Sequence, residues 1–303
     1  MTLRLLAVHA HPDDESSKGA GSYAYYRSIG VEVLVVSCTG GERGDVQNEA
    51  LAERAMAERD MAGLRRIEMA RAQAILGIDH RWLGYFDSGL PENGESVPAN
   101  SFAVIPLEFS AAPLVKIVRE FRPQVLVTYD ENGGYPHPDH IRTHEVSMYA
   151  FDAAADAARY PELGEPWQIS KVYYDRMFNP ERLGSMYDEL VASEPDSPLI
   201  PQLQEFRERF IERALPAATT NVNVGEFFEH RDGALRSHAS QVPPDSAFFF
   251  WPNDLQRRAW PYEDFELVRS LVDSTLPESD LFAGIIDQDA DGSPASTALE
   301  DRS

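Results

Sequence analysis

Histidine and acidic side chains crowd together directly after the first hydrophobic stretch of the chain. They lie in the segment 7–20, AVHAHPDDESSKGA, and surround one proline: His9, His11, Asp13, Asp14 and Glu15. Three neighbouring carboxylates repel one another, so such a cluster is unfavourable unless a positive charge lies among them. A bound metal ion would supply that charge.

A second His-Pro-Asp unit occurs in the segment 130–140, DENGGYPHPDH, which contains His137, Asp139 and His140. Each unit follows an apolar run, 3–9 or 123–130, of the kind found in buried parallel strands. The carboxyl ends of parallel strands meet at one edge of a sheet, so the two loops can converge on one site.

Imidazole nitrogen and carboxylate oxygen bind borderline metal ions, and catalytic sites use three protein ligands and leave one position for water. His11, Asp14 and His140 would provide those ligands. Asp13 would be left as a general base, and His137 could donate a hydrogen bond to a developing oxyanion or a leaving amine. This set predicts metal-assisted amide hydrolysis.

Each unit also has a simpler interpretation, because a single His-Pro-Asp can form a turn whose aspartate caps a helix. Asp139 stands where such an N-cap is expected. Two copies at one sheet edge favour the metal site. The remaining histidines and the cysteine are assigned to packing or surface positions: His9, His80, His144, His230, His238 and Cys38.

The composition is that of a globular protein, with 43% hydrophobic and 25% charged residues among 303. No apolar run approaches the roughly 18 residues of a membrane span, and one cysteine excludes an intrachain disulfide. A reducing compartment, the cytoplasm, is therefore expected. The formal net charge of −23 argues against nucleic acid and anionic membrane surfaces as partners.

Strand-like and helix-like segments alternate through the first half of the chain. The expected strands are 3–9, 31–45 (ending in a glycine-rich loop), 80–86 and 123–130, and the expected helices are 19–30, 61–78, 107–121 and one starting near Asp139. This alternation predicts an α/β fold with a Rossmann-like, mostly parallel sheet flanked by helices. The glycine fingerprint of dinucleotide-binding folds is missing after the first strand, where HAHPDD stands instead.

The second half is less regular. Strands are expected at 171–178 and 219–224 and a helix at 226–239. We expect a Rossmann-like metal-binding core at 1–160 and an irregular α+β elaboration packed on it at 161–286. The polar segment 287–303 is expected to be a disordered tail.

AHPDDE with a downstream HPDH resembles the PIG-L-type family of zinc-dependent N-acetylglucosamine deacetylases. Further matching segments extend to about residue 286: SSKGA, TGGERG, RRIEMARAQAILG, WLGYFDSGLP, TYDENGGYPHPDH and LFAGI. This fuller set resembles the actinobacterial amidase branch of the family, which acts on mycothiol S-conjugates. Lys18 in SSKGA favours that branch over its sister, the deacetylases of N-acetylglucosaminyl-inositol.

The resemblance implies His11, Asp14 and His140 as ligands of Zn²⁺, although the same ligands accept Fe²⁺. It implies Asp13 as the general base and His137 as general acid or oxyanion partner, oriented by Asp139. It also implies that Tyr135 polarises the scissile carbonyl. Three further residues are implied in substrate binding: Lys18, Arg65 and Asp87. The loop 44–63 matches no family motif, which leaves its substrate contacts open.

The implied reaction is hydrolysis of the amide of a mycothiol S-conjugate to an N-acetylcysteine S-conjugate and glucosaminyl-inositol, as in thiol-based detoxification. Within catalysis, the alternatives are the sister deacetylase and a relative that cuts a mycothiol adduct in antibiotic biosynthesis. A non-catalytic sugar- or metal-binding protein is a different class, and it could lose Asp13 or His137, yet both are present.

Overall fold

The computed structural model describes residues 2–91, 95–177, 179–212, 217–249 and 251–285. Within these ranges one seven-stranded sheet has the order β3-β2-β1-β4-β5-β7-β6. Its strands are β1 (Arg4–His9), β2 (Glu32–Thr39), β3 (Asp79–Tyr85), β4 (Val125–Thr128), β5 (Lys171–Asp175), β6 (Thr220–Asn223) and β7 (Tyr262–Ser270). Neighbouring strands from β3 to β5 are parallel, whereas β7 runs antiparallel to both β5 and β6.

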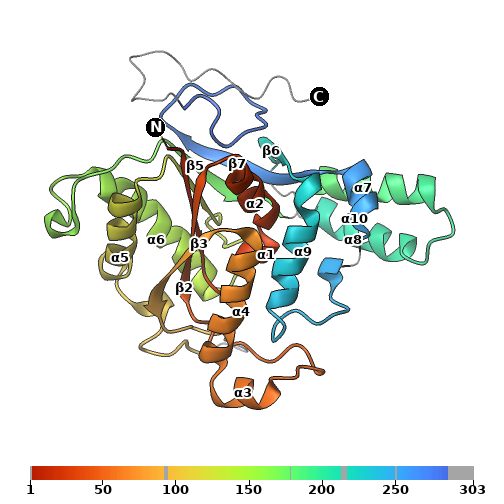
Figure 1. Cartoon of the computed structure of the whole chain (residues 1–303), viewed down its shortest axis with the longest axis horizontal. Helices are drawn as coiled ribbons and strands as arrows, with labels where there is room; N and C mark the ends of the chain where they lie inside the picture. Colours follow the sequence, from red (N-terminus) through yellow and green to blue (C-terminus); the bar gives the residue numbers. More distant parts are fainter. Residues whose placement is uncertain (1, 92–94, 178, 213–216, 250, 286–303) are drawn as a thin grey trace.

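Helices cover both faces of the sheet (Figure 1). One face carries α2 (Ala20–Ser28), α4 (Met61–Leu76) and α9 (Phe228–Ser237), and the other carries α5 (Leu107–Phe121) and α6 (Pro138–Ala155). Side chains alternate between faces along β1, so Leu5 and Ala7 join the first core while Leu6 and Val8 join the second. All four are completely buried, as a parallel strand between helix layers requires.

A third group of helices lies beside this sandwich (Figure 1): α7 (Pro180–Ser193), α8 (Ile200–Glu212) and α10 (Asn253–Ala259). They share a small apolar core that includes Met186, Leu190 and Leu255. The remaining helical segments are short: α1 (Asp14–Ser17), α3 (Arg54–Arg59), and 3-10 turns at Phe102–Val104, Pro161–Leu163, Gly225–Phe227 and Ala247–Phe249.

The α/β fold with a mostly parallel sheet and flanking helices is confirmed. The division near residue 160 stays a prediction, and β5, β6 and β7, which follow it, continue the sheet that β1 begins. β7, α1, α3, α7, α8 and α10 were not predicted from the sequence. The predicted tail 287–303 lies outside the described residues.

The loops with the His-Pro-Asp units lie where the strand order reverses. β2 pairs with one side of β1 and β4 with the other, with Leu5 opposite Val125 and Ala7 opposite Val127. The chain therefore leaves β1 and β4 side by side at the same edge. In open parallel sheets this switch point is where ligands bind.

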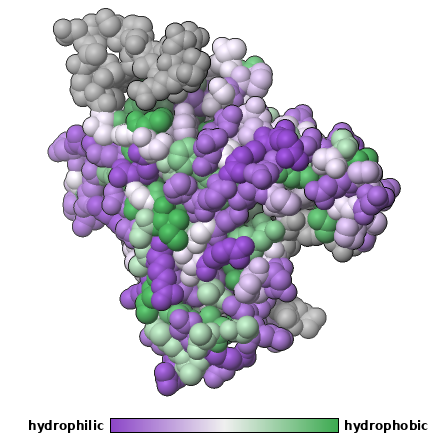
Figure 2. Space-filling model, turned by 45° about the vertical axis from the view of Figure 1, so that its right-hand side comes forward, coloured by the Kyte–Doolittle hydropathy of each residue, from purple (hydrophilic) through white to green (hydrophobic). Residues whose placement is uncertain are grey.

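On the face shown in Figure 2, polar residues predominate and apolar residues appear in scattered groups. Among the described helices, none combines the length and the apolar character needed to cross a membrane.

Candidate metal centre

The loop after β1 has an unusual backbone at Asp13, whose φ is 113°. A positive φ is uncommon for a residue with a Cβ atom and often marks a functional position. The Asp13 N–H donates to the Glu15 carboxylate at 2.9 Å, and the His11 N–H donates to Asp14 at 2.9 Å. These two bonds fold the loop back on itself and turn its carboxylates in different directions.

His11, Asp14 and His140 form a buried group whose candidate ligand atoms all lie within 4.8 Å of one another. The Asp14 Oδ2 atom is 3.5 Å from His11 Nδ1 and 3.4 Å from His140 Nε2. The structure thus brings together the three residues that the sequence analysis proposed as ligands. Their metal-binding role remains a prediction.

The orientation of His140 fits a metal ligand. Its Nδ1 lies 2.9 Å from the Gly133 carbonyl, an acceptor that fixes the proton on Nδ1 and leaves a lone pair on Nε2. The Nε2 atom is buried and has no hydrogen-bond partner among the described residues. The ring stacks on Tyr129, with centroids 4.4 Å apart and planes 12° apart. A buried unpartnered acceptor that faces Asp14 is what a bound cation would satisfy.

Gly133 permits this arrangement, because its φ is 70° and a Cβ atom there would lie 2.5 Å from the His140 Cβ. The same loop is shaped by Asp130, whose Oδ1 accepts from the N–H groups of Asn132 and Gly134 at 3.0 Å each. Arg176 holds the other oxygen of Asp130 at 2.6 Å.

Asp14 is held as a carboxylate. Burial would raise the pKa of Asp14, but Lys18, His140 and His11 outweigh burial and hold it well below its usual range. The Lys18 ammonium lies 2.5 Å from Asp14 Oδ1, and its side chain is only 9% exposed. Lys18, which the resemblance implied in substrate binding, is thus ion-paired with a candidate ligand.

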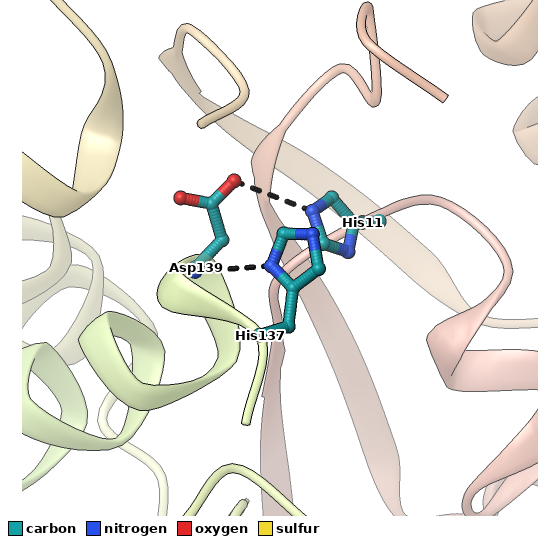
Figure 3. A group of neighbouring side chains, drawn as sticks. All are labelled: His11, His137 and Asp139. Carbon is teal, nitrogen blue, oxygen red and sulfur yellow. Dashed lines mark hydrogen bonds and ion pairs between the residues drawn. The ribbon is translucent and has the colours of Figure 1, made fainter. Parts of the chain in front are cut away.

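His137 caps helix α6. Its Nδ1 accepts a hydrogen bond of 3.1 Å from the Asp139 N–H, and Pro138 follows as the first helical residue (Figure 3). His137, not Asp139, is therefore the N-cap, which corrects the simpler interpretation of this unit. Burial and the neighbouring His11 lower the pKa of His137 to about 4. In the neutral ring the proton is on Nε2, which is then a donor.

The Asp139 carboxylate faces His11 (Figure 3), with Oδ2 3.3 Å from His11 Nε2. It also accepts from the N–H of Ser88 at 2.9 Å and from the Ser88 hydroxyl. The resemblance implied that Asp139 orients His137, and in the structure that contact comes from its backbone. His11, His137 and Asp139 form a second possible ligand group. Ser88 already satisfies Asp139, so the group with the unpartnered His140 fits a metal better.

His11 interacts with carboxylates of its own loop, after β1, and of the segment after β4. Burial would lower the pKa of His11, but Asp139, Asp14 and Asp87 outweigh burial and raise it well above its usual value. Asp87 Oδ1 lies 3.7 Å from His11 Nε2.

Asp13 has an accessible carboxylate, with 27% of its side chain exposed. Arg65 donates to Asp13 Oδ2 at 2.9 Å. Burial and the negative charge of Asp14 together raise the pKa of Asp13 against the opposing effect of Arg65. An accessible carboxylate with a raised pKa, next to the candidate ligands, is suited to accept a proton.

Arg65 and Asp87 are buried behind this surface, at 3% exposure each. Besides Asp13, Arg65 donates to the carbonyls of Pro12 and Gly41. Asp87 accepts from the N–H groups of Arg43 and Gly89. Both side chains thus brace loops around the site, and their implied contact with sugar hydroxyls stays a prediction.

A cavity of about 420 Å³ opens beside the candidate ligands. Asp13, Asp14, Lys18 and Tyr135 line it. Tyr135 is 43% exposed, and its ring lies 4.5 Å from that of His140 between centroids. A substrate in this cavity would meet the accessible base and the tyrosine together.

The pair formed by Glu15 and His238 was not predicted from the sequence. His238 Nε2 lies 2.7 Å from Glu15 Oε1, and both side chains are completely buried. The pair joins α9 to the loop that carries Asp13, because Glu15 also accepts the Asp13 N–H. No neighbour of His238 in the sequence indicates this role, and only the fold brings it to the site.

A family model described as GlcNAc-PI de-N-acetylase (PIG-L) matches residues 6–151. Several relatives match nearly the whole chain, the following two among them. A mycothiol S-conjugate amidase of Streptomyces coelicolor is 49% identical over 289 residues, which cover 94% of this chain and 98% of that protein. A 1D-myo-inositol 2-acetamido-2-deoxy-alpha-D-glucopyranoside deacetylase of Streptomyces avermitilis is 41% identical over 298 residues, covering 93% and 97%.

Several solved structures share the fold, the following two among them. The N,N'-diacetylchitobiose deacetylase of Pyrococcus horikoshii has a TM-score of 0.58 at 20% identity, and the match covers 88% of this chain and 83% of the deacetylase chain. A deacetylase from teicoplanin biosynthesis has a TM-score of 0.52 at 21% identity, and the match covers 89% of this chain and 100% of the deacetylase chain.

Proposed function

The chain belongs to the PIG-L family, and from this premise we propose that it is a metal-dependent amidase of mycothiol S-conjugates. The products would be an N-acetylcysteine S-conjugate and glucosaminyl-inositol. The observation that carries the substrate assignment is 49% identity over 98% of the Streptomyces coelicolor amidase. The single cysteine supports action in a reducing compartment such as the cytoplasm.

We assign the metal to His11, Asp14 and His140, and Zn²⁺ suits this set of two imidazoles and one carboxylate. Fe²⁺ would accept the same ligands. An ion bound there supplies Lewis-acid polarisation of the amide carbonyl and lowers the pKa of water. The unpartnered Nε2 atom of His140 is the observation that supports the assignment.

Asp13 takes the proton of the attacking water in this proposal. Its carboxylate is accessible, and Arg65 holds it from one side at 2.9 Å. Asp13 pairs with Arg65 and Asp14 with Lys18, so the two neighbouring carboxylates can serve different roles. General-base catalysis by a positioned carboxylate is typically worth about 10²- to 10⁴-fold in rate.

His137 stabilises the negative charge that develops on the carbonyl oxygen. Its Nδ1 accepts from the Asp139 backbone, which leaves Nε2–H as the donor. A donor fixed before the reaction stabilises an oxyanion at little reorganisation cost. Tyr135, whose ring lies 5.9 Å from that of His137 between centroids, polarises the same carbonyl. Lys18 lines the cavity and is proposed to contact the acyl portion. Arg65 and Asp87, which are buried and do not line the cavity, are proposed to hold the sugar side from the family resemblance.

The test uses purified protein, an S-benzyl conjugate of mycothiol and mass-spectrometric identification of both products. We expect equimolar glucosaminyl-inositol and S-benzyl-N-acetylcysteine, and one divalent metal per chain by elemental analysis. His140→Ala should lose both metal and turnover. His144→Ala, one turn along the same helix, is the matched control and should keep the metal, since its ring Nδ1 contacts the Tyr129 carbonyl. Intact conjugate after incubation with metal-loaded protein would refute the function.

The sister deacetylase is the second candidate, because the Streptomyces avermitilis enzyme is 41% identical over a similar length. It predicts acetate release from N-acetylglucosaminyl-inositol as the faster reaction.

A further inference from the structure

A second cavity, of about 340 Å³, adjoins the cavity at the metal centre. Six residues line both cavities, so the two spaces share a wall: Ser17, Lys18, Asp175, Met177, Leu235 and Phe248. A molecule whose scissile bond lies at the candidate ligands can therefore extend into the second cavity.

Most of the second cavity is apolar. Leu183 and Met186 contribute from α7, Trp251 from the segment before α10, and Phe265 from β7. An apolar pocket of this size with a few polar groups is typical of a small-molecule site. It offers far more room than an acetyl group needs.

Three charged residues in its lining are already engaged by the protein. Glu263 accepts from the N–H groups of Gly21 and Ser22 at the start of α2. Asp264 accepts from the Asn221 amide at 2.7 Å and from the Trp260 indole. Arg231 donates to several neighbours: Asp232, Asn253 and Gln256.

Two other lining residues are not satisfied in this way. Arg182 makes one hydrogen bond, of 3.4 Å, to Gln256 Oε1, and no described carboxylate forms an ion pair with its guanidinium. Asp175, in the wall between the cavities, has a buried Oδ2 atom without a hydrogen-bond partner among the described residues. A buried acceptor and an underused cation are the groups that a ligand would pair.

We propose that the second cavity binds the S-linked group of the conjugate and selects among S-substituents. In this arrangement Asp175 accepts the acetamido N–H of the cysteinyl part, the apolar wall holds the substituent, and Arg182 pairs with an acceptor or a carboxylate on it. The inference rests on the proposed function. It adds that conjugates of aromatic electrophiles with a carbonyl or carboxylate are the preferred substrates.

The electrostatics around the second cavity agree with these roles of Asp175 and Arg182. Burial raises the pKa of Asp175 to about 7, against the opposing effects of Lys18 and Arg176. Burial and the nearby Arg231 lower the pKa of Arg182, and Asp264 and Glu263 oppose this only in part. An anionic group on the ligand would compensate Arg182, and an N–H donor would satisfy Asp175.

The first experiment fills the cavity. Leu183→Trp replaces an aliphatic side chain in the cavity with a larger indole ring. Val191→Trp, on the exposed side of the same helix, is the matched control. For each protein, kcat/KM is measured on the S-benzyl conjugate and on N-acetylglucosaminyl-inositol. The ratio of the two rates should fall at least tenfold in Leu183→Trp and stay within twofold of wild type in the control. Both rates come from one preparation, so partial misfolding cancels. An unchanged ratio in Leu183→Trp overturns the proposal.

The second experiment tests Arg182 and does not need catalysis. Binding of S-benzyl-N-acetylcysteine and of its 4-carboxybenzyl analogue is measured by calorimetry with wild type and Arg182→Met. Wild type should bind the carboxylate analogue at least fivefold more tightly, and Arg182→Met should lose this preference. Equal binding of the two ligands by wild type, or no binding, overturns the proposal. A wild type that binds both ligands with the expected preference but cleaves no conjugate refutes only the proposed function.

Discussion

Replacing His238 with alanine should both destabilise the fold and slow catalysis, because His238 is the buried partner of Glu15. The two side chains are 2.7 Å apart and completely buried. After the change, the donors left to Glu15 among the described residues would be the Asp13 N–H and the Ser16 hydroxyl. A buried carboxylate would then lack its positive partner.

The expected magnitude follows from that burial. Removing one partner of a buried ion pair destabilises proteins by about 3–5 kcal/mol, far more than losing a surface pair. Glu15 also holds the backbone at Asp13, where φ is 113°, so movement of Glu15 would misplace the proposed base. Misplacing a reacting group by about 1 Å can cost on the order of 10²-fold in rate. We expect kcat to fall by about 10- to 10²-fold.

The assay is urea unfolding at pH 7 together with kcat on the S-benzyl conjugate. His230→Ala, in helix α9 just before His238, is the control: His230 is exposed, and its ring contacts Phe227. His238→Gln keeps a donor toward Glu15 and should recover part of both stability and rate, which a purely packing role would not predict. Stability of His238→Ala within about 1 kcal/mol of wild type, a value below the range for buried pairs, would refute the reasoning.

Three further predictions concern the same loop. Asp13→Asn should keep the metal and lose about 10²- to 10⁴-fold in kcat; asparagine tolerates the left-handed backbone at this position, and loss of metal in elemental analysis would make Asp13 a ligand instead. Lys18→Met should lower kcat/KM for the S-benzyl conjugate more than for N-acetylglucosaminyl-inositol; equal losses on both substrates would exclude acyl recognition by Lys18. Stability should depend on pH on both sides of neutrality. Burial disfavours the charged forms of Glu15 and His238. Even so, His238 lowers the pKa of Glu15 to about 2. Glu15, helped by Asp13 and opposed by Arg65, raises the pKa of His238. The contribution of Glu15 to the free energy of unfolding is thus complete above its usual pKa of 4.5 and is lost toward pH 2. The contribution of His238 is complete below pH 6.5 and is lost as pH rises through its raised pKa. Urea unfolding across pH should show both losses in wild type, and the alkaline one should vanish in His238→Gln.

The sequence predicted the parts of the site that local patterns determine. Apolar runs at 3–9 and 123–130 indicated parallel strands, and β1 and β4 are indeed neighbours. Because ligand-bearing loops follow these strands directly, His11, Asp14 and His140 could be expected together. The cap of α6 was assigned to the wrong residue, since aspartate is the commoner N-cap and His137 takes that place.

Contacts between distant segments could not be predicted in this way. His238 meets Glu15 across 223 positions of sequence, and neither the acidic loop nor the helix α9 signals the other. The hydrogen bond between Arg65 and Asp13, 52 positions apart, could not be foreseen either, while the expected contact of Arg65 with the substrate stays a prediction. The second cavity forms among α7, α9 and β7, and two of these elements were missed. β7 carries charged residues on both faces, which hides the alternation of a strand. In α7, Leu183, Met186 and Leu190 do stand at helical spacing, so that signal was present and was overlooked.

The central claim is that this chain cleaves the large acyl group of a mycothiol S-conjugate in preference to acetyl. The most direct test measures kcat/KM of the zinc-loaded protein for two substrates under one condition: the S-benzyl conjugate and N-acetylglucosaminyl-inositol. We expect the conjugate to be cleaved at least tenfold more efficiently. Faster acetate release from N-acetylglucosaminyl-inositol would contradict the claim and identify the sister activity instead.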